Sequence, residues 1–194
     1  MVEKSPKMYG GTCINVACLP TKYLVHSAQK LASSCRSFEE KAAAYKDVMI
    51  QKDSLIAKLN KANYNNLAEN ENITVIDGKA RFLSPHEIEV DNGSEVFTVE
   101  AGQFFINTGA VPVVPPIKGL KDNPYVYVSE TMLQLKELPK HLVIIGGGYI
   151  GIEFSSIYRQ FGSEVTILQD SDRFLAREDE EMADAVREQL TKQG

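Results

Sequence analysis

A glycine-rich turn between a short apolar run and a helical stretch constrains the fold of this chain more than any other feature. Residues 141–145 predict a buried strand, and Gly146, Gly148 and Gly151 follow it in a Gly-x-Gly-x-x-Gly pattern. Apolar residues at helical spacing come next, and residues 164–168 predict a second strand. Strand, glycine turn, helix and strand in this order predict a dinucleotide-binding α/β unit with a parallel sheet.

Each glycine of the pattern has a separate expected purpose. Gly146 permits the tight turn, Gly148 lets the backbone approach a pyrophosphate, and Gly151 lets the helix pack closely on the strand. The pyrophosphate is then expected on the N–H groups at the helix N-terminus. The alternative is that three glycines merely form a tight connection, but the flanking strands favour the nucleotide site.

The end of the second predicted strand normally distinguishes NAD from NADP, because an acid there accepts the ribose hydroxyls in NAD sites. This chain has Gln169 at that position, followed by Asp170, and Arg173 is the only nearby cation that could meet a 2′-phosphate. A glutamine can bond a hydroxyl but carries no charge. The choice between NAD and NADP stays open.

The remaining sequence predicts two helices, a small antiparallel meander and a final helix. Two helices are expected at 20–36 and 42–67, and the Asn-rich stretch 63–72 ends the second of them. The final helix is expected at 177–193. Strands are expected at 73–76, 88–90, 96–99 and 103–108, with Asp91-Asn92-Gly93 as a hairpin turn and Gly162 as a helix stop. Prolines concentrate in 111–140, so we expect domains at 1–118 and 119–194.

Composition excludes several classes of protein. The 194 residues carry 21 Lys and Arg against 26 Asp and Glu, and a net charge of -5 disfavours nucleic-acid binding. No apolar run approaches the roughly 18 residues of a membrane span, and no signal-peptide core begins the chain. Three cysteines cannot form the closed scaffold of a small secreted protein. We therefore expect a soluble, cytoplasmic protein.

Two of the cysteines lie in the most informative segment, Gly10-Gly11-Thr12-Cys13-Ile14-Asn15-Val16-Ala17-Cys18-Leu19-Pro20-Thr21-Lys22. Cys13 and Cys18 stand at the entry to a predicted helix, close enough for a bridge if the first turn is distorted. A thiolate there would be stabilised by the helix N-terminus and by Lys22. The alternative is two buried cysteines that act as small hydrophobes. Zinc is disfavoured because no histidine or second cysteine pair is near, and Cys35 is assigned to helix packing.

The segment closely resembles the redox-disulfide motif of the class I pyridine nucleotide-disulfide oxidoreductases, the flavoprotein disulfide reductases. It departs from their pattern at Ala17, where glycine is usual, and at Thr21, where serine is commoner. The form Met-Tyr-Gly-Gly-Thr-Cys-Ile-Asn is most similar to the mercuric-reductase-like branch that handles reactive chlorine or hypothiocyanous acid. The resemblance implies an α/β fold of Rossmann-like FAD- and NAD(P)-binding domains, with helices on both faces of a parallel sheet and an antiparallel meander.

The resemblance also implies which residues bind the two cofactors. NAD(P) is expected at Gly146, Gly148, Gly151 and Gln169. FAD is expected at Glu3, which matches the acid at the adenosine ribose, at Ala80 through its backbone, and at Gly11, Thr12, Lys22, Thr108 and Gly109. Asn107 stands where the family has alanine.

By the same resemblance, hydride passes from NAD(P)H to the flavin and on to a Cys13–Cys18 disulfide. Cys18 is implied to be the thiolate next to the flavin, and Cys13 the thiol that attacks the substrate. Lys22 and Glu153 are implied to form a pair of desolvated charges that tunes the flavin. Tyr149 matches the tyrosine that shields the flavin until the nicotinamide displaces it.

The family's first FAD-binding βαβ unit, its second FAD motif and its dimerisation domain have no counterpart in these residues. None of His26, His86 and His141 matches the histidine that the family supplies from the partner subunit. We therefore expect the central portion of a longer homodimeric reductase, truncated at both ends and inactive alone, with a small disulfide, a metal ion or a hypohalous-type oxidant as substrate. Two alternatives are a non-enzymatic dinucleotide-binding redox sensor with a Cys13–Cys18 switch, and an interaction module that has lost activity.

Overall fold

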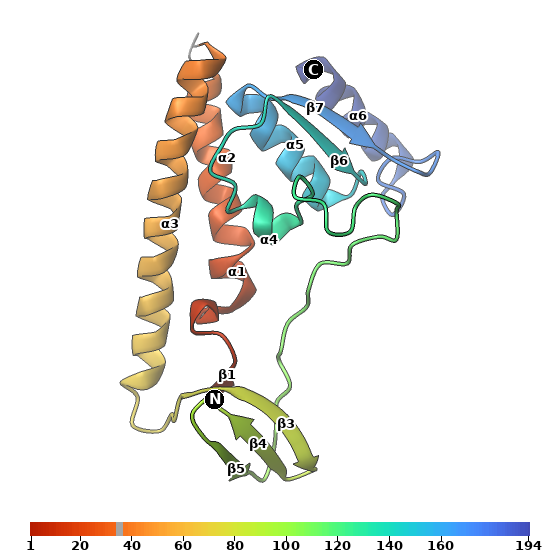
Figure 1. The fold of residues 1–194 in the computed structure, drawn as a ribbon. Coiled ribbons are helices and arrows are strands. Elements are labelled where there is room, and N and C mark those ends of the chain that lie inside the picture. Colours follow the sequence, from red (N-terminus) through yellow and green to blue (C-terminus); the bar gives the residue numbers. More distant parts are fainter. Residues whose placement is uncertain (34–36) are drawn as a thin grey trace. The chain divides into compact units, whose positions relative to one another are not determined.

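The computed structural model describes residues 1–33 and 37–194 and divides them into two compact units. One unit comprises residues 1–20 and 54–128, and the other comprises residues 21–53 and 129–194. The expected packing role of Cys35 falls outside the described residues. Figure 1 labels the helices and strands of both units.

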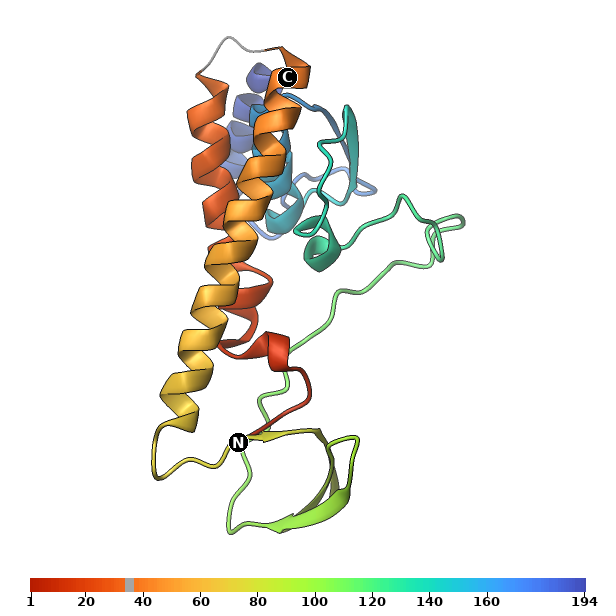
Figure 2. The same cartoon turned by 60° about the vertical axis from the view of Figure 1, so that its left-hand side comes forward.

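Two long helices, α2 (Cys18–Ala32) and α3 (Phe38–Ala68), correspond to the two helical stretches expected from the sequence. They lie side by side in Figures 1 and 2. The Tyr23 hydroxyl of α2 donates to Gln51 Oε1 of α3 at 2.9 Å. Ser37 and Glu40 start α3 as a capping box, since the Ser37 N–H donates to the Glu40 carboxylate and the Glu40 N–H to Ser37 Oγ. The Asn-rich stretch ends α3, as expected.

The unit of residues 21–53 and 129–194 contains the glycine turn. β6 (His141–Ile145) and β7 (Glu164–Leu168) pair in parallel and are joined by α5 (Tyr149–Phe161), which confirms the strand-helix-strand prediction. Gly162 ends α5 in the left-handed region at φ +106, with its N–H on the Tyr158 and Arg159 carbonyls. The short α4 (Ser129–Met132) precedes β6, and α6 (Glu180–Gln193) starts at an Asp179 cap.

The hydrophobic core of this unit lies where α5 meets α2 and α3. Phe161 is fully buried and its ring packs edge-on against Tyr45, with centroids 5.0 Å apart. The Tyr45 and Tyr158 hydroxyls hydrogen-bond each other at 2.9 Å. Burial of one such aromatic side chain contributes about 1.5–3 kcal/mol. The core residues are Leu24, Ala28, Tyr45, Met49, Met132, Leu133, Leu138, Phe154, Ile157, Tyr158 and Phe161.

The expectation that β6 is a buried strand is wrong for one of its faces. Leu142 and Ile144 pack against the core, but Val143 and Ile145 are each 50% exposed. Side chains alternate between the two faces of a strand, and α5 packs on only one face of the β6–β7 pair. An unbroken apolar run therefore predicted more burial than this strand has.

The other unit is built from two small sheets. β1 (Val2–Glu3) pairs in parallel with β2 (Ile76–Asp77), and a 3-10 turn (Pro6–Met8) leads to α1 (Gly11–Asn15). β3 (Lys79–Ser84), β4 (Glu87–Asp91) and β5 (Val96–Glu100) form the antiparallel meander. The expected hairpin turn is confirmed, since Gly93 lies at φ +85 and Asn92 Oδ1 accepts the Ser94 and Glu95 N–H groups.

Two strand predictions in this unit are wrong. Residues 103–108 form no strand, because no neighbouring strand supplies backbone partners, and Phe105 and Ile106 are 91% and 72% exposed. Of residues 73–76, only Ile76 enters a strand. Alternation identifies a segment able to form a strand, but the pairing partner decides whether one forms. Across residues 1–33 and 37–194, no helix has the length and apolar character to cross a membrane.

Candidate active site

The cysteine segment places its two thiols at the junction of two helices. Cys13 lies in α1, Cys18 is the first residue of α2, and both are exposed to solvent and reduced in this structure. Val16 breaks the helix between them at φ −139, which is the distorted turn that a bridge requires. The alternative of two buried cysteines is therefore wrong.

The Cys13 thiol has a pKa above its ordinary value. The first cause is a hydrogen bond with the Cys18 side chain, and the second is desolvation. We expected the helix entry and Lys22 to stabilise a thiolate in this segment, and for Cys13 the direction is the opposite. The neighbouring sulfur is the stronger influence, so the structure favours a proton on Cys13.

The pair expected from α2 and α5 is present. Lys22 Nζ donates to Glu153 Oε1 at 2.8 Å, although the two residues stand 131 positions apart in the sequence. The expectation that both charges are desolvated is wrong, because the side chains are 70% and 31% exposed. An ion pair this open to water contributes little to stability. It joins the helix that begins at Cys18 to the helix that begins after the glycine turn.

The glycine turn has the steric properties that its pattern predicts. Gly146 lies in the left-handed region at φ +100. A Cβ on Gly151 would stand 2.5 Å from the Gly146 carbonyl oxygen and 3.1 Å from an Ile144 methyl group. No atom lies within 4 Å of the Cβ position of Gly148, so its backbone is open to a ligand. Packing therefore requires a glycine at position 151, whereas Gly148 faces open space.

Gln169 and Phe174 contact the middle of this turn. Gln169 Oε1 accepts the Gly147 N–H at 2.7 Å, and its amide nitrogen donates to Ser171 Oγ at 2.8 Å. The ring of Phe174 lies 2.8 Å from the Cβ position of Gly147. The sequence placed Gln169 at the end of β7 but gave no sign that its carboxamide reaches the turn.

Tyr149, the first residue of α5, is 64% exposed, and its hydroxyl donates to the Glu178 carboxylate. This hydrogen bond is the main reason why the pKa of Tyr149 lies above its ordinary value. Glu178 and Phe174 were missed as site residues at the sequence level. Phe174 lies in an irregular segment without periodicity, and Glu178 was expected inside the helix 177–193 but precedes α6, which begins at Glu180.

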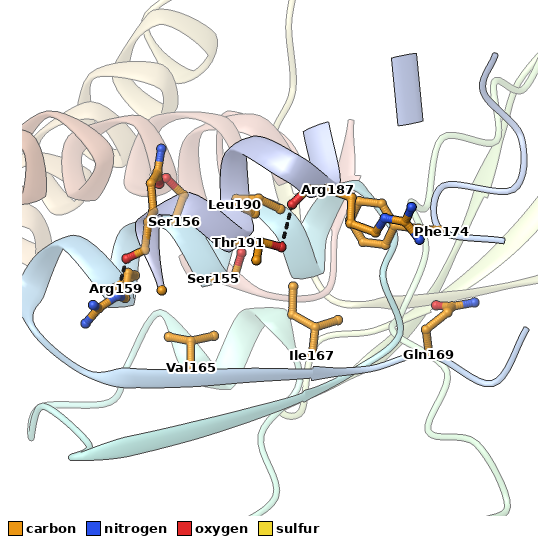
Figure 3. Close-up of a pocket in the computed structure, with 12 residues that line it drawn as sticks. Ser155, Ser156, Arg159, Val165, Ile167, Gln169, Phe174, Arg187, Leu190 and Thr191 are labelled. Atoms are coloured by element: carbon orange, nitrogen blue, oxygen red, sulfur yellow. Dashed lines mark hydrogen bonds between the residues drawn. The ribbon is translucent and has the colours of Figure 1, made fainter. Parts of the chain in front are cut away.

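A pocket of about 440 Å³ lies between α5, β7 and α6 (Figure 3). Gln169 and Phe174 line it, as do two arginines from different helices, Arg159 and Arg187. Arg159 Nε donates to the Gln193 carbonyl at 2.7 Å, and Arg187 pairs with Asp184 at 2.8 Å. Neither arginine lies in a recognisable sequence motif, so neither was predicted as a site residue.

Apart from Lys22, which belongs to the unit of residues 21–53 and 129–194, the residues assigned to FAD by resemblance lie in the unit of residues 1–20 and 54–128. Glu3 lies in β1, and its carboxylate accepts the Ser5 N–H at 3.0 Å. Thr12 and Gly109 come together, since a Cβ on Gly109 would stand 3.8 Å from Thr12 Oγ1. Ala80 lies in β3, and Gly11 and Thr108 are exposed.

No group of three metal-ligating side chains gathers within residues 1–33 and 37–194. His86 lies opposite the Ala101 carbonyl, and the His141 ring hydrogen-bonds Thr166 Oγ1 at 2.9 Å. Both histidines are exposed, His86 in the turn before β4 and His141 at the start of β6, and both are far from the cysteine segment in sequence.

Comparison with known proteins decides the family. The model of the pyridine nucleotide-disulphide oxidoreductases matches residues 1–194. The chain belongs to this family. It is 45% identical over 194 residues to the probable pyridine nucleotide-disulfide oxidoreductase RclA of Escherichia coli, covering 100% of this chain and 42% of RclA.

Other similar proteins are also much longer than this chain. A mercuric reductase of Lysinibacillus sphaericus is 37% identical over 200 residues, covering 100% of this chain and 35% of that protein. A dihydrolipoyl dehydrogenase of Bacillus subtilis is 35% identical over 195 residues, covering 95% of this chain and 42% of that protein. The chain thus spans less than half the length of these relatives.

Solved structures agree with this assignment. The HOCl-induced flavoprotein disulfide reductase RclA of Escherichia coli matches with a TM-score of 0.88 at 45% identity, covering 100% of this chain and 41% of that one. Its Cu(II) complex matches with a TM-score of 0.89 at 44% identity and the same coverage. The α/β fold expected from the sequence is confirmed, and proteins of this family use FAD and NAD(P)H.

Proposed function

We propose that this chain carries the redox-active dithiol and parts of both cofactor sites of an NAD(P)H-dependent flavoprotein reductase. The observation that carries the proposal is the 2.8 Å Lys22–Glu153 bond, which ties the helix after the cysteines to the helix after the glycine turn. An exposed pair stabilises a fold little, so a chemical purpose accounts for it better than a structural one.

The glycine turn fits a dinucleotide. The open backbone at Gly148 is suited to a pyrophosphate, and the tight contact at Gly151 holds the helix N-terminus against β6. Gln169 would hydrogen-bond the adenosine ribose, for which its amide must leave the Gly147 N–H. Tyr149 would cover the flavin and move aside for the nicotinamide.

The residues of the other unit fit FAD in part. Glu3 would accept the adenosine ribose hydroxyls, and Ala80 would contact the adenine end through its backbone. Thr12 and Gly109, which come together, would border the flavin with Gly11 and Thr108. Lys22 of α2 is also proposed as a FAD residue. FAD supplies, when bound, the two-electron chemistry that links NAD(P)H to a disulfide.

The two cysteines have different proposed roles. Cys13, whose pKa is raised, would have to lose its proton before it attacks the substrate, and the histidine that the family supplies from the partner subunit would take that proton. Cys18 would be the thiolate next to the flavin. Lys22 follows Cys18 by about one turn of α2 and would supply positive charge near that thiolate. Glu153 would hold the Lys22 ammonium in place.

The substrate is proposed to be a small disulfide, a metal ion or a hypohalous-type oxidant. The last two are supported by the names of the similar proteins, a mercuric reductase and an HOCl-induced reductase. We further propose partial FAD- and NAD(P)-binding domains at 1–118 and 119–194. The longer protein is proposed to be a cytoplasmic homodimer.

A chimera tests the function. This chain replaces the matching segment of Escherichia coli RclA, and the purified protein is titrated anaerobically with NADH and then NADPH. We expect a flavin spectrum that bleaches and gains a long-wavelength thiolate-to-flavin band. The band should disappear in Cys18→Ser and persist in Cys35→Ser. A flavin-loaded chimera that is bleached by NAD(P)H and forms the band equally in Cys18→Ser would contradict the proposal.

A further inference from the structure

A buried tyrosine beside α1 has no part in the chemistry described above. Tyr9 is 4% exposed, and its hydroxyl donates to the carboxylate of Asp77 at the end of β2. Its ring packs edge-on against Tyr64 of α3, with centroids 4.9 Å apart. Burial first, and then the bond to Asp77, hold the pKa of Tyr9 well above its ordinary value. The hydroxyl therefore stays protonated and remains a donor.

The backbone of Tyr9 anchors the turn that carries Cys13. Its carbonyl oxygen accepts the side-chain amides of Asn15 at 2.9 Å and Asn60 at 3.1 Å. Asn60 also donates to Asn15 Oδ1 at 3.1 Å, and Asn15 donates to the Gly11 carbonyl at 2.8 Å. Asn15 and Gly11 are the last and first residues of α1, so both ends of the turn are tied to Tyr9.

Close packing limits movement of the same turn. Gly10 lies in the left-handed region at φ +90, and a Cβ there would stand 2.6 Å from an Ile14 methyl group. The Asn63 side chain of α3 is 3.2 Å from the same position. The segment before Cys13 is therefore held by α3 as well as by the bond to β2.

We propose that Tyr9, through its hydrogen bond to Asp77, is a positioning residue that fixes α1 and thereby sets the reduction potential of the Cys13–Cys18 pair. The inference rests on the proposed function only in requiring that these two thiols form a reversible disulfide. The established pattern of cysteines, glycines and the Lys22–Glu153 pair does not include Tyr9, Asp77 or Asn60.

The position of α1 affects the reduction potential through the effective concentration of the Cys13 thiol at the Cys18 thiol. Disulfide formation joins the two sulfurs and releases two electrons and two protons to an external disulfide, which becomes a dithiol. With α1 held, Cys13 already hydrogen-bonds the Cys18 side chain, so little chain entropy is lost on closing the bond. If α1 is released, formation of the disulfide must order α1 again, which costs conformational entropy. The disulfide is then less stable, and the potential rises.

The test is a redox equilibrium of the 194-residue chain in a Cys35→Ser background. The chain is equilibrated with mixtures of reduced and oxidised dithiothreitol, and the Cys13–Cys18 disulfide is quantified by mass spectrometry. In Tyr9→Phe, which keeps the ring but loses the donor, we expect the equilibrium constant for disulfide formation to fall about tenfold, a rise of about 30 mV. Tyr64→Phe is the matched control, since it removes the hydroxyl of the partner ring, and it should change the constant less than about twofold.

A second residue keeps the test decisive if Tyr9→Phe folds poorly. Asp77→Ala should lower the equilibrium constant for disulfide formation about tenfold as well. Asp77→Asn keeps an acceptor oxygen and should restore most of the parent's constant. The double variant of Tyr9→Phe with Asp77→Ala should lower the constant no more than either single variant. A merely structural Tyr9 would lower the urea stability of the dithiol and disulfide forms equally and leave the constant unchanged.

Two failures are distinguishable. An unchanged constant in both Tyr9→Phe and Asp77→Ala, with a reversible disulfide in the parent, overturns the positioning role alone. A parent chain that forms no Cys13–Cys18 disulfide at any ratio of the buffer contradicts the proposed function, and the positioning role with it.

Discussion

The glycine turn and the cysteine segment both lead into a helix, but they are held in place by different means. At the turn, backbone sterics decide the geometry, because Gly151 has no room for a Cβ and Gly148 has ample room. At the cysteine segment, polar side chains from β2 and α3 hold α1. The steric constraints on the first region therefore come from residues close in sequence, with Gln169 as a more distant contact, whereas the polar contacts of the second region come from distant residues.

The strongest test of this contrast is a substitution at the turn. Gly151→Ala should lower the free energy of unfolding by about 2–3 kcal/mol, because the methyl group must displace the Gly146 carbonyl and Ile144. Gly148→Ala, which meets open space, should change it by less than about 1 kcal/mol while weakening NAD(P) binding. Urea unfolding and nucleotide titration measure both. Equal losses of stability at the two positions would break the steric account.

The next largest effect concerns the anchor of the cysteine segment. Asn60→Ala removes two hydrogen bonds, to the Tyr9 carbonyl and to Asn15, and should cost about 1–2 kcal/mol in urea unfolding. Asn66→Ala, at an exposed position further along α3, should cost less than about 0.5 kcal/mol. If both variants unfold alike, the segment is not held from α3.

Thiol reactivity sharpens the account of the cysteines. The hydrogen bond with Cys18 raises the pKa of Cys13, so at pH 8 less Cys13 is thiolate than in an isolated thiol. Cys18→Ala removes this cause, lowers the pKa of Cys13 and should speed its alkylation by iodoacetamide severalfold at pH 8. Peptide mass spectrometry follows Cys13 specifically. A slower reaction in Cys18→Ala would show that Cys18 activates its neighbour.

The smallest effect on stability is expected at the pair that joins the two helices. Lys22→Met should change the free energy of unfolding by less than about 0.5 kcal/mol, because the Lys22 side chain is 70% exposed. Lys52→Met is the matched comparison: Lys52 is 3% exposed, donates to the Leu133 carbonyl and pairs with Asp53, and its loss should cost at least about 1 kcal/mol. Similar costs for both lysines would make the Lys22–Glu153 pair structural.

The sequence allowed prediction of those features that local chemistry decides. Helices α2, α3, α5 and α6, the βαβ unit, the Gly162 stop and the hairpin at Asn92 were predicted from residue spacing and from glycines that can adopt positive φ angles. The short helices α1 and α4 were not predicted. The strand at 103–108 was predicted wrongly because pairing depends on a partner, not on alternation. The burial of β6 was overestimated for a similar reason, since its exposed face depends on what packs there.

Within the candidate site, the cysteines, the glycines and the Lys22–Glu153 pair were identified in advance, the last only by resemblance. The contacts of Tyr9 with Asp77 and of Gln169 with Gly147 were not, because each joins residues that no motif relates. The exposure of Lys22 and the raised pKa of Cys13 also required three-dimensional contacts. Residue types at a site are readable from sequence, whereas their solvation and second partners are not.

The central claim is that electrons from NAD(P)H reach Cys13 and Cys18. The most direct measurement is thiol counting in the flavin-loaded RclA chimera, in a Cys35→Ser background, oxidised and then given one equivalent of NADPH or NADH without oxygen. The account predicts two new thiols per NAD(P)H oxidised, mapped by alkylation to Cys13 and Cys18. A chimera that oxidises NAD(P)H while the Cys13–Cys18 disulfide stays intact would contradict it.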